Sequence, residues 1–207
     1  MIAIVDYGVG NLFSLQSSFR AIGEDALVTG DPAKIESADR IILPGVGAFG
    51  DAAKKLRDTG LGDAVKRAAL SGKPLMGICL GMQLLFDKSY EYGEHEGLGL
   101  IRGSVMPIGD VIGPDLKIPH IGWNALTIKA PSPILKYVKG GDCVYFVHSF
   151  YAAQCGESVI ATAEYGAELT AAVQKGSVYG CQFHPEKSGK VGLSILKAFC
   201  ETEAGAC

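Results

Sequence analysis

The 207-residue sequence lacks an apolar run of transmembrane length, and no basic segment precedes its first apolar residues. We therefore expect Met1–Tyr7 to form a strand and not a secretory signal or a membrane anchor. An excess of either charge is also missing, because 19 Lys and Arg face 22 Asp and Glu for a formal net charge of −3. Nucleic acids and anionic membranes attract proteins through surplus basic residues, so we expect neither as a partner.

Paired and clustered cysteines are missing as well. The six cysteines form no C-x-x-C pair and no small-domain framework; they are Cys79, Cys143, Cys155, Cys181, Cys200 and Cys207. Disulfide-rich secreted domains and structural zinc sites both need such spacing. We therefore predict reduced thiols, a cytoplasmic protein and no metal site.

Glycine, in contrast, is abundant, and its 28 copies often lie between short apolar segments. In the first half of the chain, nearly all-apolar strands alternate with helical spacing, which predicts a parallel sheet covered on both faces. The predicted strands are 1–7, 26–29, 40–43 and the segment beginning at Pro74, and the predicted helices are 12–22, 51–59 and 61–71.

The second half changes to short strands separated by glycine and polar pairs, as in hairpins. These predicted strands are 100–106, 123–128, 143–150, 158–164, 171–174 and 178–182, followed by a closing helix at 189–203. No linker or repeat interrupts the chain. We predict one domain over residues 1–207, with an α/β three-layer fold, a mostly parallel, flavodoxin-like sheet and an antiparallel extension.

Gly8-x-Gly10 follows the first strand, as in dinucleotide-binding proteins. Phe13 replaces the third glycine of that pattern, and no acidic residue is well placed after a second strand, so we do not expect a dinucleotide site. Asn11 is a favourable helix cap instead. Ligands of doubly wound sheets bind at the carboxyl ends of the strands, where the glycine-rich turns after Tyr7, Leu43 and Ile78 would lie.

The most informative turn is Gly77-x-Cys79-x-Gly81, which separates an apolar strand from a helical segment. It matches the nucleophile-elbow pattern with cysteine in place of serine. A tight turn needs residues without a β-carbon beside the nucleophile. A helix N-terminus next to the sulfur favours the thiolate, so Cys79 is the candidate nucleophile.

A thiol nucleophile needs a base, and the base needs an orienting group. His184 and Glu186 lie two residues apart in an extended segment, so their side chains point the same way and can hydrogen-bond. They complete a Cys–His–Glu triad with Cys79. We expect His95 and His120 to be surface residues.

The segment Pro44–Gly50 is a second glycine-rich strand end. Glycine permits backbone conformations that turn N–H groups outward, as an oxyanion site requires. A plain strand–helix connection would show the same composition, and from these residues alone both interpretations stay open.

Together the elbow, the glycine loop and Phe183-His184-Pro185-Glu186 resemble the class I (triad-type) glutamine amidotransferases over essentially the whole chain. Many members have Pro-Gly-Gly at the oxyanion loop. Four segments are similar, more narrowly, to the glutaminase subunits of imidazole glycerol phosphate synthase: Asp6–Leu12, Pro44–Phe49, Ile118–Asn124 and Tyr145–Tyr151. Phe150 departs mildly from them, because tyrosine is frequent there.

The resemblance implies that Cys79 attacks the side-chain amide of glutamine, that His184 relays the proton and that Glu186 orients His184. It places the oxyanion donors on the backbone of the Val46–Gly47 segment and of Leu80. The implied substrate-binding residues are Gly45, Gln83, Glu91, His148, Ser149 and Phe150. No cofactor is implied.

The same resemblance implies glutamine as the substrate and a (β/α)8-barrel cyclase subunit as the partner in a heterodimer. The cyclase would use the ammonia to make imidazole glycerol phosphate and an aminoimidazole carboxamide ribonucleotide. Ammonia must not reach bulk water, where it is protonated, so the docking face should surround the site. We expect Asn11, Trp123 and Lys187 in that interface, with Trp123 as an apolar anchor.

Three alternatives remain. A glutaminase subunit of another pathway is disfavoured by Gly45-Val46-Gly47 and by the segment His120–Asn124. A catalytically silent interaction domain on this fold is disfavoured by the intact triad. A cysteine hydrolase or peptidase of related fold would not normally take its base from a His-Pro-Glu segment at this position.

Overall fold

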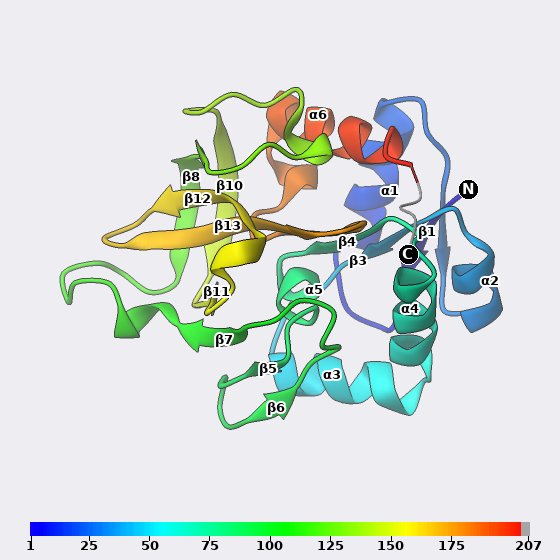
Figure 1. The fold of residues 1–207 in the computed structure, drawn as a ribbon, viewed down its shortest axis with the longest axis horizontal. Coiled ribbons are helices and arrows are strands. Elements are labelled where there is room, and N and C mark those ends of the chain that lie inside the picture. The colour runs from blue at the N-terminus through cyan, green and yellow to red at the C-terminus, as the bar shows by residue number, and fades with distance from the viewer. Residues whose placement is uncertain (204–207) are drawn as a thin grey trace.

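The computed structural model describes residues 1–203 of the chain, and its centre is an eight-stranded sheet (Figure 1). The strand order is β2-β1-β3-β4-β14-β13-β12-β9, in which the first five strands are parallel and the rest antiparallel. The strands are β1 (Ile2–Val5), β2 (Ala26–Thr29), β3 (Arg40–Leu43), β4 (Leu75–Ile78), β9 (Thr127–Ile128), β12 (Val159–Glu164), β13 (Glu168–Lys175) and β14 (Val178–Cys181).

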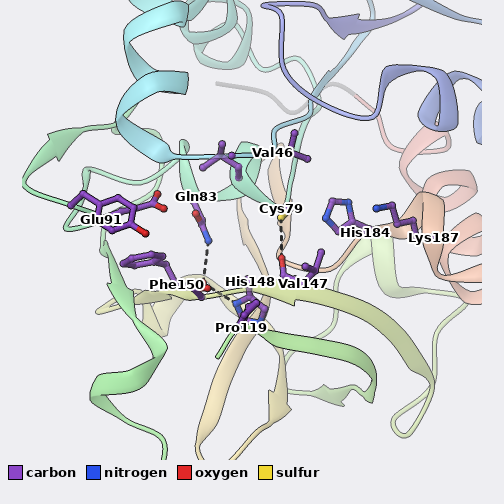
Figure 2. A pocket seen from close by; sticks show the side chains of 14 residues that line it. Val46, Cys79, Gln83, Glu91, Pro119, Val147, His148, Phe150, His184 and Lys187 are labelled. Atoms are coloured by element: carbon purple, nitrogen blue, oxygen red, sulfur yellow. Dashed lines mark hydrogen bonds between the residues drawn. The ribbon is translucent and has the colours of Figure 1, made fainter. Parts of the chain in front are cut away.

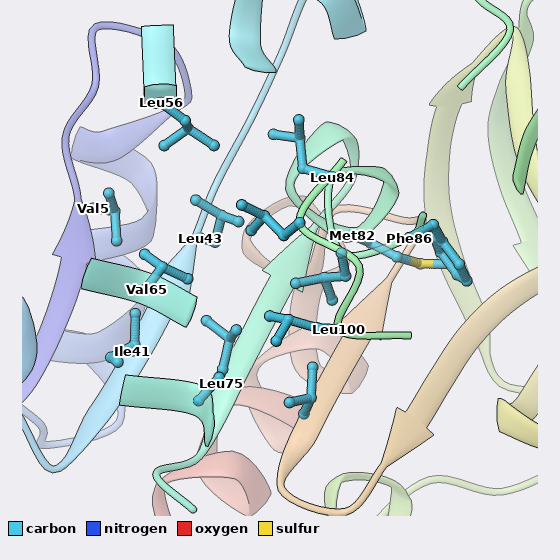
Figure 3. Packing of buried hydrophobic residues seen from close by; sticks show 14 of the residues in the cluster. Val5, Ile41, Leu43, Leu56, Val65, Leu75, Met82, Leu84, Phe86 and Leu100 are labelled. Atoms are coloured by element: carbon cyan, nitrogen blue, oxygen red, sulfur yellow. The ribbon is translucent and has the colours of Figure 1, made fainter. Parts of the chain in front are cut away.

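Helices cover both faces of this sheet, so the fold is the expected three-layer α/β arrangement (Figure 1). One face packs against α2 (Pro32–Ser37), α3 (Phe49–Asp58) and α4 (Leu61–Leu70), and Figure 3 shows this core. The other face packs against α1 (Leu12–Ala21) and α6 (Gly189–Cys200). Alternate residues of each strand enter the two cores, which is why the strands are apolar throughout.

The strands of the second half that do not enter the central sheet form two smaller sheets, in which every pair is antiparallel except the parallel pair of strands 88–89 and 104–107. The first pairs β8 (His120–Ala125) with β10 (Cys143–His148), and the second has the order β11-β7-β5-β6. Its strands are β5 (Lys88–Ser89), β6 (His95–Glu96), β7 (Ser104–Pro107) and β11 (Phe150–Ala153). The chain passes from one small sheet to the other at Ser149, which divides the strand predicted over 143–150.

Some element boundaries differ from expectation. The strand predicted over 100–106 begins only at Ser104, because Gly103 has a φ of 138° next to it. The helix after the elbow, α5 (Leu80–Gln83), has only four residues. Asn11 occupies the N-cap position of α1 but its side chain makes no capping hydrogen bond. The predicted cap position is therefore confirmed, but the hydrogen bond expected of the Asn11 side chain is absent.

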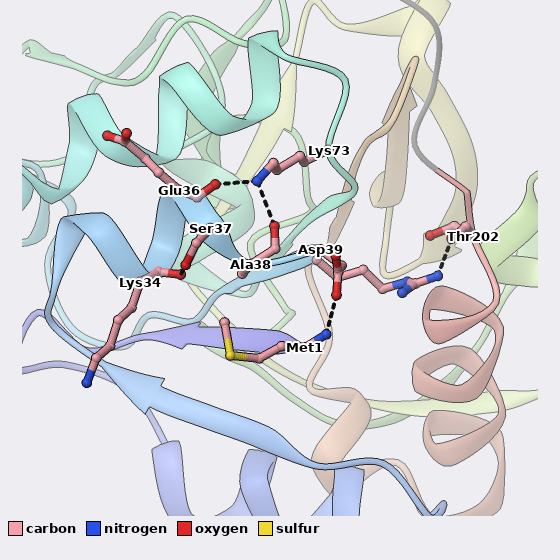
Figure 4. Close-up of polar contacts among 9 residues, drawn as sticks. Met1, Lys34, Glu36, Ser37, Ala38, Asp39, Lys73 and Thr202 are labelled. Carbon is pink, nitrogen blue, oxygen red and sulfur yellow. Dashed lines mark hydrogen bonds and ion pairs between the residues drawn. The ribbon is translucent and has the colours of Figure 1, made fainter.

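The amino-terminal edge of the parallel strands is closed by polar contacts (Figure 4). The Met1 ammonium group pairs with Asp39, and Lys73 donates to the Glu36 carbonyl and, at 2.8 Å, to the Ala38 carbonyl. The glycine-rich turns lie at the opposite edge, where the parallel strands have their carboxyl ends. Within residues 1–203, no helix is long and apolar enough to span a bilayer.

Candidate active site

Cys79 is the residue between β4 and α5, and its backbone is unusual. Its φ of 55° and ψ of −113° lie where residues other than glycine are rare. The flanking glycines make this turn possible: a Cβ on Gly77 would lie 2.5 Å from the Gly81 oxygen, and one on Gly81 would lie 1.8 Å from the Leu43 oxygen. The elbow predicted from the sequence is therefore present.

His184 reaches the same edge from the neighbouring strand. β14 pairs with β4 in parallel, with Cys181 opposite Ile78, so Cys79 and His184 follow the carboxyl ends of adjacent strands. Figure 2 shows the His184 ring beside Cys79. His184 Nδ1 lies 2.8 Å from Glu186 Oε1, and both side chains are buried. Glu186 Oε2 has no hydrogen-bond partner among residues 1–203.

The charge of His184 is set by opposing effects. Burial alone lowers its pKa, but the adjacent Cys79 sulfur and the Glu186 carboxylate outweigh burial and raise the pKa to about 9. The imidazolium form is therefore favoured at neutral pH. A protonated ring beside the sulfur stabilises a thiolate and holds a proton for a leaving group.

A cavity of about 370 Å³ opens over Cys79 (Figure 2). It gathers most of the predicted site residues: Val46, Gly47, Cys79, Leu80, Gln83, Glu91, His148, Ser149, Phe150, His184 and Lys187. Tyr92, Pro119 and Val147 also line it and were not predicted. Gly45 does not line the cavity. It packs against the elbow, where an added Cβ would lie 2.8 Å from Gly81 N and 3.0 Å from Leu80 Cβ.

Two acceptor groups lie in this cavity, away from the sulfur. Glu91 Oε2 accepts a 2.7 Å hydrogen bond from Phe49 N at the start of α3, and burial raises the Glu91 pKa. Gln83 Nε2 donates both its hydrogens within the protein, to Phe150 O at 3.1 Å and to Gln182 Oε1 at 3.0 Å. Gln83 can therefore offer a ligand only its oxygen. A carboxylate and an amide oxygen together suit an ammonium group.

The two expected sources of oxyanion donors also meet here. Leu80 is the first residue of α5, so its N–H has no acceptor within the helix. Across the cavity, Gly47 has a φ of 93°. The buried Tyr7 hydroxyl donates to Pro44 O at 2.7 Å and holds the beginning of the loop.

Comparison with known proteins then decides the family. The model of the family "Glutamine amidotransferase class-I" matches residues 3–202. The chain belongs to this family. It is 50% identical over 204 residues to the imidazole glycerol phosphate synthase subunit HisH of Caldanaerobacter subterraneus, covering 97% of this chain and 98% of that protein. It is 49% identical to the subunit HisH of Wolinella succinogenes, over 97% of this chain and 99% of the relative.

A solved structure, that of PurLQS from Thermotoga maritima, agrees at the level of the fold. It matches with a TM-score of 0.76 at 22% identity and covers 96% of either chain. The predicted class I amidotransferase fold is thus confirmed. The roles of individual residues in this amidotransferase remain predictions that rest on the geometry above.

The predicted interface residues lie on one side of the site. Trp123 is 58% exposed and its ring contacts that of Tyr145, over which the Lys187 ammonium lies at 5.9 Å. Asn11 is half-buried before α1, and the exposed Phe13 of that helix shares a surface hollow with Glu186.

The prediction for His120 was wrong. We expected a surface residue, but the ring is 3% exposed and stacks between Phe146 and Tyr165, with centroids at 4.9 and 4.1 Å. Both stacking partners are distant in the sequence, so the proline-flanked loop gave no sign of them. Gln182 was missed too, although a glutamine directly before Phe183-His184 at the end of a buried strand was the available signal.

Proposed function

We propose that this amidotransferase chain hydrolyses glutamine to glutamate and ammonia and delivers the ammonia to the cyclase subunit of imidazole glycerol phosphate synthase in histidine biosynthesis. The observation that carries the proposal is the cavity that joins Cys79, the His184 ring held by Glu186 from behind, and the two acceptors of Gln83 and Glu91. Near-full-length relatives named as subunits of that synthase support the choice of pathway.

The geometry supports the following steps. The glutamine ammonium group binds Glu91 and the Gln83 oxygen, and the side-chain amide lies over Cys79 Sγ. The sulfur attacks the amide carbon, and backbone N–H groups of Leu80 and of the Val46–Gly47 segment hold the oxyanion.

The second half of the reaction returns the enzyme to its starting state. His184 gives its proton to the departing nitrogen, which leaves as ammonia, and a γ-glutamyl thioester remains on Cys79. His184 then removes a proton from a water molecule, which attacks the thioester and releases glutamate. Glu186 keeps the His184 ring oriented throughout.

For the partner we propose a (β/α)8-barrel cyclase that docks around the cavity mouth and forms a heterodimer. Lys187 lines the cavity itself, and Trp123 lies next to Gly189, just beyond the triad. Contacts there would enclose the path of the ammonia. We also propose that the chain acts as one domain and works in the cytoplasm, since its five described cysteines are free thiols.

The test replaces the nucleophile. Cys79→Ala should abolish glutamine-dependent synthesis by the reconstituted complex but leave synthesis from added ammonium salt near the wild-type rate, because only the glutaminase half is lost. Cys143→Ala is the matched control, since Cys143 is exposed and begins β10, at the opposite end of that strand from His148. Equal loss of both activities in Cys79→Ala would contradict the proposed role.

A further inference from the structure

A buried chain of hydrogen bonds leads away from Cys79 on the side opposite the triad. Gln182 is fully buried and its Nε2 lies 3.8 Å from Cys79 Sγ. Its Oε1 lies 3.0 Å from Gln83 Nε2, and the same nitrogen of Gln83 lies 3.1 Å from Phe150 O (Figure 2). None of the roles proposed above uses Gln182.

The Phe150 carbonyl, which belongs to the main chain and cannot rotate like a side-chain amide, determines which atom donates in each of these bonds. A main-chain carbonyl only accepts, so Phe150 O requires the amino side of the Gln83 amide to face it. That amino group also faces Gln182, so Gln182 must present its oxygen to Gln83. The remaining end of Gln182, its NH₂ group, therefore points at Cys79 Sγ.

The same carbonyl is also contacted by a pair of buried histidines. His148 Nδ1 lies 2.8 Å from Phe150 O, and His148 Nε2 lies 3.0 Å from His120 Nδ1. Burial lowers the pKa of His148 to about 4 and also lowers that of His120, so both rings are neutral. His148 must donate through Nδ1, which leaves Nε2 as an acceptor and makes His120 Nδ1 the donor.

The chain ends at the edge of the extension. His120 Nε2 is then an acceptor, and Asn124 Nδ2, 3.4 Å away, also donates to Glu164 O at 2.7 Å. His120 is held by stacking on Phe146 and Tyr165. The donor is therefore fixed in each of three hydrogen bonds: Asn124 donates to His120, His120 donates to His148, and His148 donates to Phe150 O.

We propose that Gln182 is a positioning residue that holds an N–H donor on the Cys79 sulfur, and that the His120–His148 pair holds in place the Phe150 carbonyl that sets this orientation through Gln83. The inference rests on the proposed function of Cys79 as the nucleophile. Hydrogen bonds to a charged acceptor are stronger than neutral ones, so the donor favours thiolate over thiol. The amide groups of Gln83 and Gln182 orient the hydrogen bonds but transfer no protons.

The titratable groups that face Cys79 are Tyr7 beyond β1 and His184 beyond β14, with Glu186 behind His184, and Glu91, His148 and Lys187 line the same cavity. All of them are retained in the Gln182 variants below. Gln182→Glu adds a carboxyl group beside the sulfur, so the uncharged Gln182→Met decides whether loss of the donor alone changes thiolate formation. The measurement is the rate of Cys79 alkylation by iodoacetamide as a function of pH, followed by mass spectrometry of the peptide. Cys143 in the same sample is the internal reference.

Gln182→Glu keeps the oxygen that Gln83 needs and replaces the NH₂ group with a second oxygen. We expect the pH midpoint of Cys79 alkylation to rise by about one unit or more, with the Cys143 curve unchanged. Gln174→Glu makes the same exchange on β13, where the Gln174 side chain donates to Gly176 O, and should leave the midpoint within experimental error. An unchanged midpoint in Gln182→Glu would overturn the proposal.

Gln182→Met is a second variant for the case in which a buried carboxylate prevents folding. It keeps the volume and removes the donor, and it should also raise the midpoint. A folded Gln182→Met variant with the wild-type midpoint would overturn the proposal equally.

The histidine pair is tested by His120→Phe, which keeps the ring stack but removes the donor to His148. We expect a smaller rise of the midpoint in the same direction. In the double variant with Gln182→Met, the rise should equal that of Gln182→Met alone, because His120 acts only through Gln182. Additive rises would overturn the part assigned to the histidines.

Failure of this inference can be told apart from failure of the proposed function. Alkylation needs neither glutamine nor the cyclase. Unchanged midpoints with normal glutamine hydrolysis would refute only the role of Gln182. A wild-type complex without glutaminase activity would refute the proposed function, whatever the midpoints.

Discussion

At the scale of single residues, the protonated His184 ring links stability to pH. Its pKa is about 9 in the folded chain and about 6.5 in an unfolded one, so the folded state binds more protons between these values. The stabilisation is complete below about pH 6.5 and is lost as the pH rises through 9. We predict that the free energy of unfolding falls by on the order of 3 kcal/mol over this range.

Urea unfolding at pH 6.5 and pH 9.5 measures this loss. His184→Asn should remove most of the pH dependence, whereas His95→Asn, a half-buried histidine in β6, should keep it. A wild-type protein equally stable at both pH values would show that the ring is neutral in the folded state.

Tyr7 offers a second test at this scale. Tyr7→Phe removes only the hydroxyl that donates to Pro44 O and leaves that carbonyl buried without its partner. We predict a loss of about 1–3 kcal/mol in the free energy of unfolding, together with slower glutamine hydrolysis, because the loop bearing Val46 and Gly47 loses an anchor.

Tyr137→Phe is the control, since its hydroxyl bonds to Glu201 at an exposed position, and it should cost less than about 0.5 kcal/mol. A Tyr7→Phe variant as stable and active as this control would mean that the loop holds its shape without the bond.

At the scale of elements, the strand–turn–helix around Cys79 depends on close backbone approach. Gly81→Ala should destabilise the chain by roughly 3 kcal/mol or more, because the new Cβ meets the Leu43 carbonyl of the neighbouring strand. Gly140→Ala, in a loop where no described residue other than the chain neighbours comes within 4 Å of the added Cβ, should be nearly neutral. Thermal denaturation of both variants makes the comparison, and equal melting temperatures would contradict it.

The elements near this turn were also the most predictable from sequence. The triad is encoded in two short segments: the glycines flanking Cys79, and the spacing of His184 and Glu186. The strand over 143–150 was predicted without its break, because nothing local shows that Ser149 carries the chain between two sheets. His120 was misplaced for the same reason, since its burial depends on Phe146 and Tyr165 from other strands.

At the scale of the whole molecule, the proposed docking face makes a prediction about assembly. Trp123→Ala should weaken binding of the cyclase subunit by about 30-fold or more, as for an aromatic hot spot, because an exposed anchor is lost. The unfolding free energy of the separate chain should hardly change. Isothermal titration calorimetry measures the affinity.

Tyr137→Ala removes a ring that is also exposed, beside the carboxyl-terminal end of α6, and should leave the affinity unaltered. If both variants bind like wild type, the cyclase docks elsewhere.

The position of β14 between β4 and β13 has a consequence for synthesis of the chain on the ribosome. Residues 1–78 emerge first and can pair β1, β2, β3 and β4, but the edge of β4 stays open until residue 178 and those after it have been made. Cys79 has no base until the same moment. A nascent chain therefore has a sheet with an unpaired edge and a cysteine without its base. Insertion of β14 beside β4 pairs that edge and brings His184 to Cys79.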